Sequence, residues 1–174
     1  VKDPEFVQFH PTGLVPNGIL ITEGARGEGG VLLNNKGERF MLRNGCAPKM
    51  KELAPRDVVS RCMVREYLEG RAFIDEATGM PYLLLDLTHL GEEKINDKLP
   101  SIREIAIRYI GVDPVEQPLP VFPSMHYHMG GINTDGYYRV LDVNGNWIKG
   151  LFSAGEASAA SIHGANRLGS NSTA

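Results

Sequence analysis

The sequence of 174 residues is long enough for one domain of ordinary size or for two small ones. Its apolar fraction of 42% is close to the globular average, so a hydrophobic core is feasible. The formal net charge of −3 and the lack of a basic stripe argue against nucleic acid or an acidic membrane surface as a partner. No apolar run approaches the roughly 20 residues of a membrane-spanning helix.

The chain ends and the cysteines bear on the kind of protein. The first residue is Val1 rather than Met, and the chain stops within the glycine-bearing stretch GSNSTA. We therefore expect a piece of a longer protein, without a signal peptide in this stretch. Cys46 and Cys62 lie far apart and lack metal-ligand spacing, which predicts reduced cysteines in a reducing compartment rather than a disulfide scaffold.

The first third of the chain predicts short strands and turns. EFVQFHPTGL alternates and then breaks at Pro11 and Gly13, as a short strand does where it runs into a loop. GILITEG is a second short apolar run that glycine ends. ARGEGGVLLNNKGERFM predicts a strand at Val31–Leu33, a tight NNKG turn and another short strand over ERFM.

The middle of the chain predicts helices around one strand. APRDVVSRCMVREYLEG has apolar residues at helical spacing, with Pro55 and Asp57 suited to a first turn and Gly70 to a stop. MPYLLLDLTHL predicts a buried strand. A second helical region runs from about Glu92 to Ile110, and Pro100 should divide it.

The last third returns to strands. DPVEQPLPVFPSM carries four prolines and predicts an extended connector. YYRVLDVNGNWIKGLFSAGEA predicts a strand, an Asn-Gly turn and a strand that ends at Gly155, while the glycine-bearing tail predicts a loop leading into a helix start. The two chain ends resemble each other more than either resembles the middle, so they are compatible with one domain that the middle interrupts.

Several polar residues sit beside glycine or proline, where scaffolds often present functional groups. They are His10, Thr22, Glu23, Arg56, His126 and Arg167. Two arginines, two histidines and a threonine suit a small dicarboxylate, because arginine binds a carboxylate by two parallel hydrogen bonds while His and Thr each donate a single one.

Each candidate also has a structural interpretation. His10 can bond a neighbouring carbonyl, Thr22 can cap or pack, Glu23 can pair with Arg26, and Arg56 can be a solvated arginine. His128 and His163 are interpreted as structural.

A histidine metal site is a weaker alternative, since His-x-His comes without an Asp, Glu or Cys ligand pattern, and we predict none. The tail lacks the lysine spacing of a phosphate-binding loop, and no G-x-G-x-x-G is present.

Six stretches together carry a family resemblance. In one order, the sequence contains FVQFHPTGL, ILITEGARGEGG, ELAPRDVVSR, HYHMGGINTD, GLFSAGEAS and HGANRLGSNS. This order resembles the flavoprotein subunit of succinate dehydrogenase and fumarate reductase, from Glu5 to Thr173. The resemblance implies an α+β fold, with a mixed capping domain inserted between strands of a partial Rossmann-like FAD-binding domain. Residues 1–20 would be an edge of the FAD domain, residues 21–123 the cap, and residues 124–174 the incomplete return into the FAD-binding domain.

The resemblance also implies roles for individual residues. His10, Thr22, His126 and Arg167 would hold the two carboxylates of fumarate or succinate.

The catalytic residues implied by the resemblance are Arg56 and Glu23. Arg56, on the cap, would pass a proton to or from a substrate carbon while hydride passes to or from the flavin. Glu23 would support the site as part of a proton relay. Cap closure would bring Arg56 over the substrate and expel water.

The flavin side of the site is implied by the segment around AGEAS and ANRLGSNS. Glu156, Leu168, Ser170 and Asn171 would lie against FAD. FAD belongs to the parent protein, and we do not expect the chain alone to retain it, because the dinucleotide fingerprint is missing.

The family further implies an iron–sulfur subunit and membrane anchor subunits as partners, and a peripheral position on the cytoplasmic side of the inner membrane. The direction of the reaction, succinate oxidation or fumarate reduction, stays open.

Two alternatives to this function also stay open. L-aspartate oxidase shares much of the pattern but usually has alanine at the positions of Gly13, Gly24 and Gly169. A chain of this length is also compatible with a capping-domain fragment that has no catalytic activity.

Overall fold

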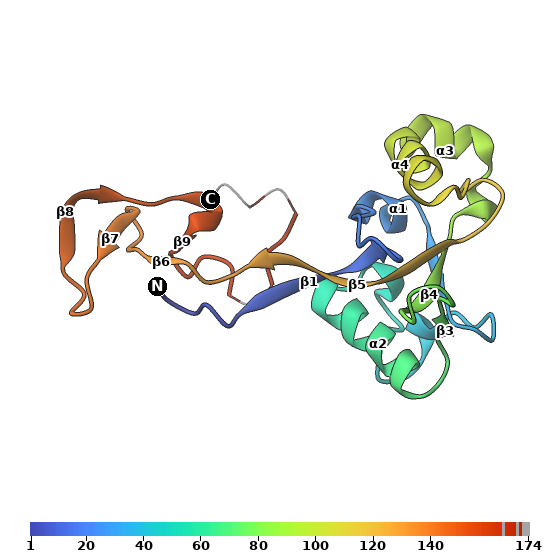
Figure 1. The fold of residues 1–174 in the computed structure, drawn as a ribbon, viewed down its shortest axis with the longest axis horizontal. Helices are drawn as coiled ribbons and strands as arrows, with labels where there is room; N and C mark the ends of the chain where they lie inside the picture. Colours follow the sequence, from blue (N-terminus) through green and yellow to red (C-terminus); the bar gives the residue numbers. More distant parts are fainter. Residues whose placement is uncertain (165, 170, 172–174) are drawn as a thin grey trace. The chain divides into compact units, whose positions relative to one another are not determined.

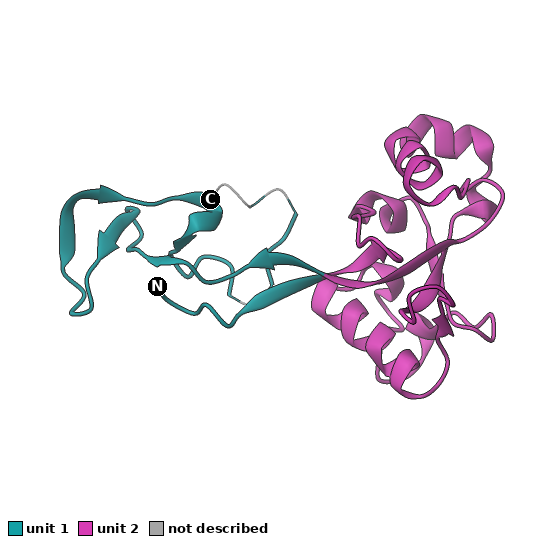
Figure 2. Ribbon diagram, viewed as in Figure 1, with its two compact units in different colours: residues 1–9, 125–174 teal, residues 10–124 magenta. Residues whose placement is uncertain are grey.

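The chain folds into two compact units in a computed structural model that describes residues 1–164, 166–169 and 171. Unit 1 contains both ends of the chain, Val1–Phe9 and Met125–Ala174, and unit 2 contains His10–Ser124 (Figure 2). The boundaries fall within two strands, β1 (Val7–Leu14) and β5 (Leu119–His128). Among the described residues, no helix combines the length and apolar character needed to cross a membrane.

A curled sheet organises unit 2 (Figure 1). Its strand order is β1-β5-β4-β2, with β4 at Pro81–Asp86 and β2 at Val31–Leu33, and the short β3 (Phe73–Ile74) also pairs with β4. The register is antiparallel, with Leu85 opposite both Leu32 and Leu119. Because side chains alternate along a strand, this register gathers leucines on one buried face.

Four α-helices and three 3-10 turns flank the sheet. They are α1 (Glu23–Gly27), α2 (Arg56–Leu68), α3 (Glu92–Lys98), α4 (Pro100–Ile110), η1 (Phe40–Leu42), η2 (Lys51–Leu53) and η3 (Thr88–Leu90). The predicted α2 and the division at Pro100 are confirmed. Pro100 takes the first turn of α4, where its missing N–H costs nothing.

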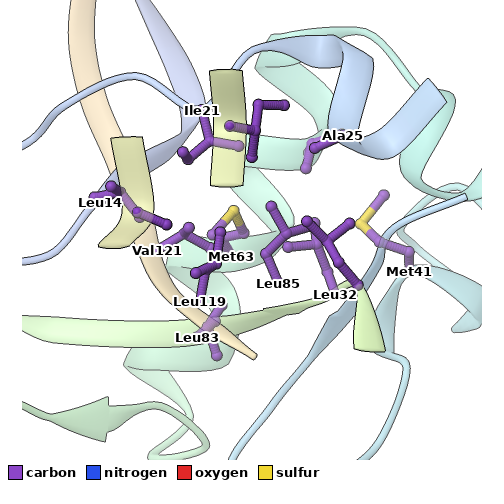
Figure 3. Close-up of a cluster of buried hydrophobic side chains, with 14 of the residues drawn as sticks. Leu14, Ile21, Ala25, Leu32, Met41, Met63, Leu83, Leu85, Leu119 and Val121 are labelled. Carbon is purple, nitrogen blue, oxygen red and sulfur yellow. The ribbon is translucent and has the colours of Figure 1, made fainter. Parts of the chain in front are cut away.

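The core of unit 2 lies between α2 and the sheet (Figure 3). Met63 of α2, Leu85 of β4 and Leu32 of β2 belong to one buried cluster, which Leu14 of β1 and Ile21 join. All five side chains are fully buried. Each contributes about 1.5–3 kcal/mol of transfer free energy, which fixes α2, and therefore its first residue, against the sheet.

Unit 1 consists of two small paired elements. β7 (Arg139–Leu141) and β8 (Trp147–Phe152) form the predicted antiparallel hairpin, and β6 (Ile132–Asn133) pairs in parallel with β9 (Ser158–Ala159). A last 3-10 turn, η4, covers Gly155–Ala157. Near β6, a Cβ at Gly130 would lie 2.0 Å from the carbonyl oxygen of Asp3, so only glycine permits this approach of two backbones.

Some sequence predictions were wrong. β1 continues through Pro11 and Gly13, because it is an edge strand and an edge does not require the N–H that proline lacks. The strand predicted over ERFM is instead η1, whose Phe40 is fully buried. The tail of the chain forms the short β9, and the helix start expected at its end falls where residues 170 and 172–174 lie outside the described residues.

The prediction of reduced cysteines was also wrong, since Cys46 and Cys62 form a disulfide with their Cα atoms 5.8 Å apart.

Candidate active site

Arg56 and Glu23 form an ion pair in unit 2. Arg56 is the first residue of α2. Pro55 before it is the N-cap residue and has an extended backbone, so the helical conformation starts only at Arg56. The Arg56 Nε donates to Glu23 Oε1 at 2.8 Å. Only 7% of the Arg56 side chain is exposed, whereas 46% of the Glu23 side chain is exposed. The pair therefore joins a buried cation to a carboxylate that solvent can reach.

A second arginine lies behind this carboxylate. Arg26, one turn after Glu23 in α1, has its Nη2 3.7 Å from Glu23 Oε1 and is buried. Its Nη1 donates to the carbonyl oxygen of Glu52 at 2.5 Å. Burial lowers the pKa of Arg26, with a further lowering from the charge of Arg56, against an opposing effect of Glu23. The Glu23 carboxylate thus stands between two guanidinium groups.

His10 and Thr22 are the other predicted residues of unit 2. His10 is fully buried, and its Nδ1 accepts the backbone N–H of Thr12 at 3.3 Å. A neutral ring with Nδ1 as acceptor carries its proton on Nε2, which is the tautomer that can donate to a carboxylate. Thr22 is the exposed N-cap residue of α1, and its side chain makes no capping hydrogen bond.

Arg167 and His126 are in contact in unit 1. Arg167 is 5% exposed, and its Nη2 donates to His126 Nε2 at 3.0 Å. Its Nη1 donates to the carbonyl oxygen of Leu168 at 3.2 Å, and its guanidinium carbon lies 4.2 Å from the centre of the Tyr127 ring. Within the part of the chain that the structure describes, no carboxylate lies within 4 Å of Arg167, and its buried Nε has no hydrogen-bond partner.

The Arg167–His126 contact also fixes the state of the imidazole. A guanidinium only donates, so His126 Nε2 is the acceptor and a neutral ring carries its proton on Nδ1. The loop is held from β1, because Gln8 Nε2 donates to the carbonyl oxygen of Arg167 at 2.7 Å and to Asn166 Oδ1 at 3.0 Å.

The comparisons with known proteins cover nearly the whole chain. The FAD-binding domain family matches residues 1–173. The chain belongs to this family. It is 57% identical over 172 residues to the flavoprotein subunit of the 8-methylmenaquinol:fumarate reductase of Wolinella succinogenes, which covers 98% of the chain and 26% of that relative. It is 51% identical over 176 residues to the succinate dehydrogenase flavoprotein subunit of Rickettsia bellii, which covers 99% and 29% respectively.

A solved structure gives the same result. A quinol fumarate reductase chain of Escherichia coli matches 98% of this chain with a TM-score of 0.88 and 47% identity. The match covers 29% of that chain. The resemblance to flavoprotein subunits of the succinate dehydrogenase and fumarate reductase group is therefore confirmed, and this member of the FAD-binding domain family spans less than a third of the length of these relatives.

A cavity in unit 1 fits the flavin that the family name implies. It has a volume of about 270 Å³ and is lined by Asp3, Phe6, Tyr127, Met129, Gly155 and the segment 158–164. Half of these residues are glycine, alanine or serine, which leaves room for a planar ring, and Phe6 and Tyr127 add aromatic surface. The lining includes Gly155 beside Glu156, and the described residues Glu156, Leu168 and Asn171 are themselves exposed.

The predicted Ser170 lies outside the described residues.

His128 is exposed and His163 lines the cavity. Among the described residues, no three His, Cys, Asp or Glu side chains gather as a metal-ion site.

Sequence reasoning missed Gln8 and Tyr127, and it named Arg26 only as a possible partner of Glu23, a pairing that the 3.7 Å contact confirms. Gln8, Tyr127 and Arg26 all lie inside the stretches that carried the family resemblance, next to the residues that were selected. The signal that could have found them is that each lies within three residues of a selected candidate in the sequence. Burial raises the pKa of the Tyr127 hydroxyl, the charge of Glu156 raises it further, and the charge of Arg167 opposes both. The hydroxyl therefore stays protonated, and the ring beside the Arg167 guanidinium is uncharged.

Proposed function

We propose that the chain is part of the flavoprotein subunit of an enzyme that interconverts succinate and fumarate. Residues 21–123 serve as a capping domain, inserted between the FAD-domain segments 1–20 and 124–174. The names of the relatives, their identities of 48–57% and their coverage of 98% or more of this chain support this function. The joining of both chain ends in unit 1 supports the insertion.

Arg167 and His126 bind one substrate carboxylate in this proposal. Arg167 is buried and lacks a carboxylate partner among the described residues, so its charge is available to an anionic ligand. A bidentate guanidinium–carboxylate contact is worth about 1.5–3 kcal/mol per charge-assisted hydrogen bond. His10, through Nε2–H, and the exposed Thr22 hydroxyl bind the other carboxylate.

Arg56 and Glu23 transfer the proton. The observation that carries this proposal is the 2.8 Å hydrogen bond between a buried guanidinium and a carboxylate that solvent reaches. Arg56 gives a proton to the substrate carbon during reduction, and Glu23 returns one from solvent. A guanidinium releases a proton reluctantly, so Arg56 depends on the Glu23 carboxylate at 2.8 Å to return a proton after each turnover.

FAD would supply hydride chemistry in the parent protein, and the cavity beside Tyr127 together with Glu156, Leu168 and Asn171 would hold it. Ser170, which belongs to the same proposal, lies outside the described residues. The chain's own contribution is orientation, which lowers a barrier by about 7–11 kcal/mol in favourable cases. Closure of the cap excludes water from the substrate and gates turnover.

The partners follow from the same assignment. The parent subunit docks an iron–sulfur subunit and membrane anchor subunits, as a peripheral component on the cytoplasmic side of the inner membrane. The relatives whose names include quinol or ubiquinone support an electron path to a membrane quinone.

The test is steady-state kinetics of the full-length flavoprotein with Arg56→Gln. Loss of a positioned acid predicts a fall in kcat of about 10²–10⁴-fold in both directions of the reaction. Arg61→Gln is the matched control, because Arg61 is an exposed arginine of the same helix that pairs with Asp57. Full activity of Arg56→Gln would refute the assignment. Formation of iminoaspartate from L-aspartate by the unaltered protein would instead assign it to the L-aspartate oxidases.

A further inference from the structure

A second cavity lies in unit 2, against the disulfide. Its volume is about 260 Å³, and Cys46 is part of its wall. Cys46 is half-buried in the loop before η2, whereas its partner Cys62 is 3% exposed in the middle of α2. A Cα separation of 5.8 Å is within the usual range for disulfides, so the two backbones hold the cysteines in place for bonding. Only the Cys46 side of the bond therefore faces the cavity.

The wall of this cavity is cationic. It contains four basic and two acidic side chains, namely Lys36, Arg43, Arg65, Arg71, Glu66 and Glu69. Arg43 and Arg71 both pair with Glu66, and Arg71 also pairs with Glu69. Arg43 pairs in addition with Glu38, which lies outside the wall, so four basic groups face three carboxylates. Within the described residues, neither Lys36 nor Arg65 has a carboxylate within 4 Å. The cavity thus keeps an excess of positive charge.

Arg65 brings part of this charge to the disulfide. Its Nη1 donates to the carbonyl oxygen of Gly45 at 3.1 Å, directly before Cys46 in the chain. A cation beside a cysteine favours a thiolate and attracts an anionic attacking group. The surroundings of Cys46 are therefore those of a reactive sulfur, while Cys62 has the burial of an inert one.

We propose that this cavity is a thiol–disulfide exchange site for a small thiol that carries carboxylates. The incoming thiolate attacks Cys46 Sγ, a new S–S bond forms to Cys46, the Cys46–Cys62 bond breaks, and Cys62 leaves as a thiolate that takes up a proton. A second thiol attacks the outer sulfur of the mixed disulfide, releases Cys46 as a thiol, and leaves with the first as their disulfide. Two electrons pass from the two small thiols to the protein. This proposal is independent of the proposed function.

The consequence for the fold concerns α2. The disulfide ties the loop that holds Cys46 to the helix that begins with Arg56, six residues before Cys62. Reduction removes this tie and leaves the helix held by its buried apolar face. The site therefore couples the thiol–disulfide state of the surroundings to the anchoring of α2.

The experiment uses the full-length flavoprotein, first equilibrated with oxidised glutathione and then freed of it. Reduction is followed by trapping thiols with an alkylating reagent and mapping the peptides. Glutathione is compared with cysteamine, a cationic thiol, at equal thiolate concentration. The expected result is a mixed disulfide on Cys46 and alkylation of Cys62, with glutathione faster than cysteamine by about tenfold at low salt.

Substitutions separate the parts of the proposal. Arg65→Gln should lower the preference for glutathione at least threefold, whereas Arg61→Gln, outside the cavity on the same helix, should leave it unchanged. Cys62→Ser should leave a Cys46 that takes up glutathione, and Cys46→Ser a Cys62 that does not. Two free thiols after the oxidised-glutathione step, equal rates for both thiols, or a mixed disulfide on Cys62 would each overturn the proposal.

Discussion

Two buried arginines, Arg56 in unit 2 and Arg167 in unit 1, have opposite surroundings. Arg56 donates to a carboxylate that solvent reaches. Arg167 donates to an imidazole and a carbonyl and lies on an aromatic ring, without a carboxylate within 4 Å among the described residues. A guanidinium already paired with a carboxylate is suited to exchange protons, whereas one whose charge is uncompensated is suited to hold an anion. The surroundings, rather than the residue type, assign the two roles.

The largest expected effect removes the carboxylate that distinguishes Arg56. Glu23→Gln keeps the size of the side chain but cannot carry a proton between solvent and Arg56. We expect kcat of the full-length protein to fall by about 10²–10³-fold with KM nearly unchanged. Glu28→Gln is the control, since Glu28 ends the same helix and pairs with Lys94. A rise in KM without a change in kcat would place Glu23 among the binding residues.

The next prediction concerns Glu52, which holds Arg26 in place beside Glu23. Glu52 accepts two hydrogen bonds from Arg39 and one from the backbone N–H of Leu32, and its carbonyl holds Arg26. Burial alone would raise the pKa of Glu52, but these hydrogen bonds outweigh it and lower the pKa. Glu52 is buried but the Arg39 side chain is 34% exposed, so Glu52→Gln should lower the free energy of unfolding at pH 7 by about 1.5–3 kcal/mol, the usual worth of a charged hydrogen bond.

The pH dependence of this loss has a definite sign. A carboxyl whose pKa is lowered by folding stabilises the fold fully above its unfolded pKa of about 4.3, and this stabilisation is lost as the pH falls through the folded pKa. The difference in stability between Glu52→Gln and the unaltered protein should therefore shrink below about pH 4. Urea denaturation at a series of pH values measures it, and a difference that grows in acid would contradict the assignment.

Arg167→Lys tests the other arginine. Lysine keeps the charge but loses the flat fork that binds a carboxylate by two parallel hydrogen bonds. We expect KM to rise by about 30-fold, equivalent to about 2 kcal/mol, with a smaller change in kcat. Initial-rate measurements over a range of fumarate concentrations decide between the two parameters. An unchanged KM would show that Arg167 does not bind the substrate.

The smallest expected effect comes from the ring under Arg167. Tyr127→Leu removes a cation–π contact worth about 1 kcal/mol, so KM should rise by about fivefold. Tyr127→Phe keeps the ring and should restore KM to within twofold of the unaltered protein, since the hydroxyl is not part of the contact. If Phe and Leu behave alike, the ring does not orient the guanidinium.

Local signals predicted much of the fold. Pro55, Gly70 and Pro100 mark helix ends by their own backbone chemistry, so α2 and the division between α3 and α4 followed from the sequence. The strand predicted over ERFM was wrong, because four residues are too few to show a clear hydrophobic periodicity. The segment forms the 3-10 turn η1 instead, which buries both Phe40 and Met41.

The site could be predicted only in part. Arg56 and Glu23 were selected by their position beside glycine or proline, their roles came from a family resemblance, and their 2.8 Å contact needed the fold. Tyr127 is 40 residues from Arg167, and Cys46 is 16 from Cys62, so neither contact leaves a periodic signal in the sequence. Such long-range contacts depend on how packed elements meet.

The most direct test of the two-arginine account is equilibrium binding of fumarate to the oxidised full-length flavoprotein, followed by the change in flavin absorbance. Arg56→Gln should bind fumarate with a Kd within about threefold of the unaltered protein although it turns over poorly, while Arg167→Gln should weaken binding by about 100-fold, or about 2.7 kcal/mol. Equal weakening in both variants, or tight binding by Arg167→Gln, would contradict the division of roles.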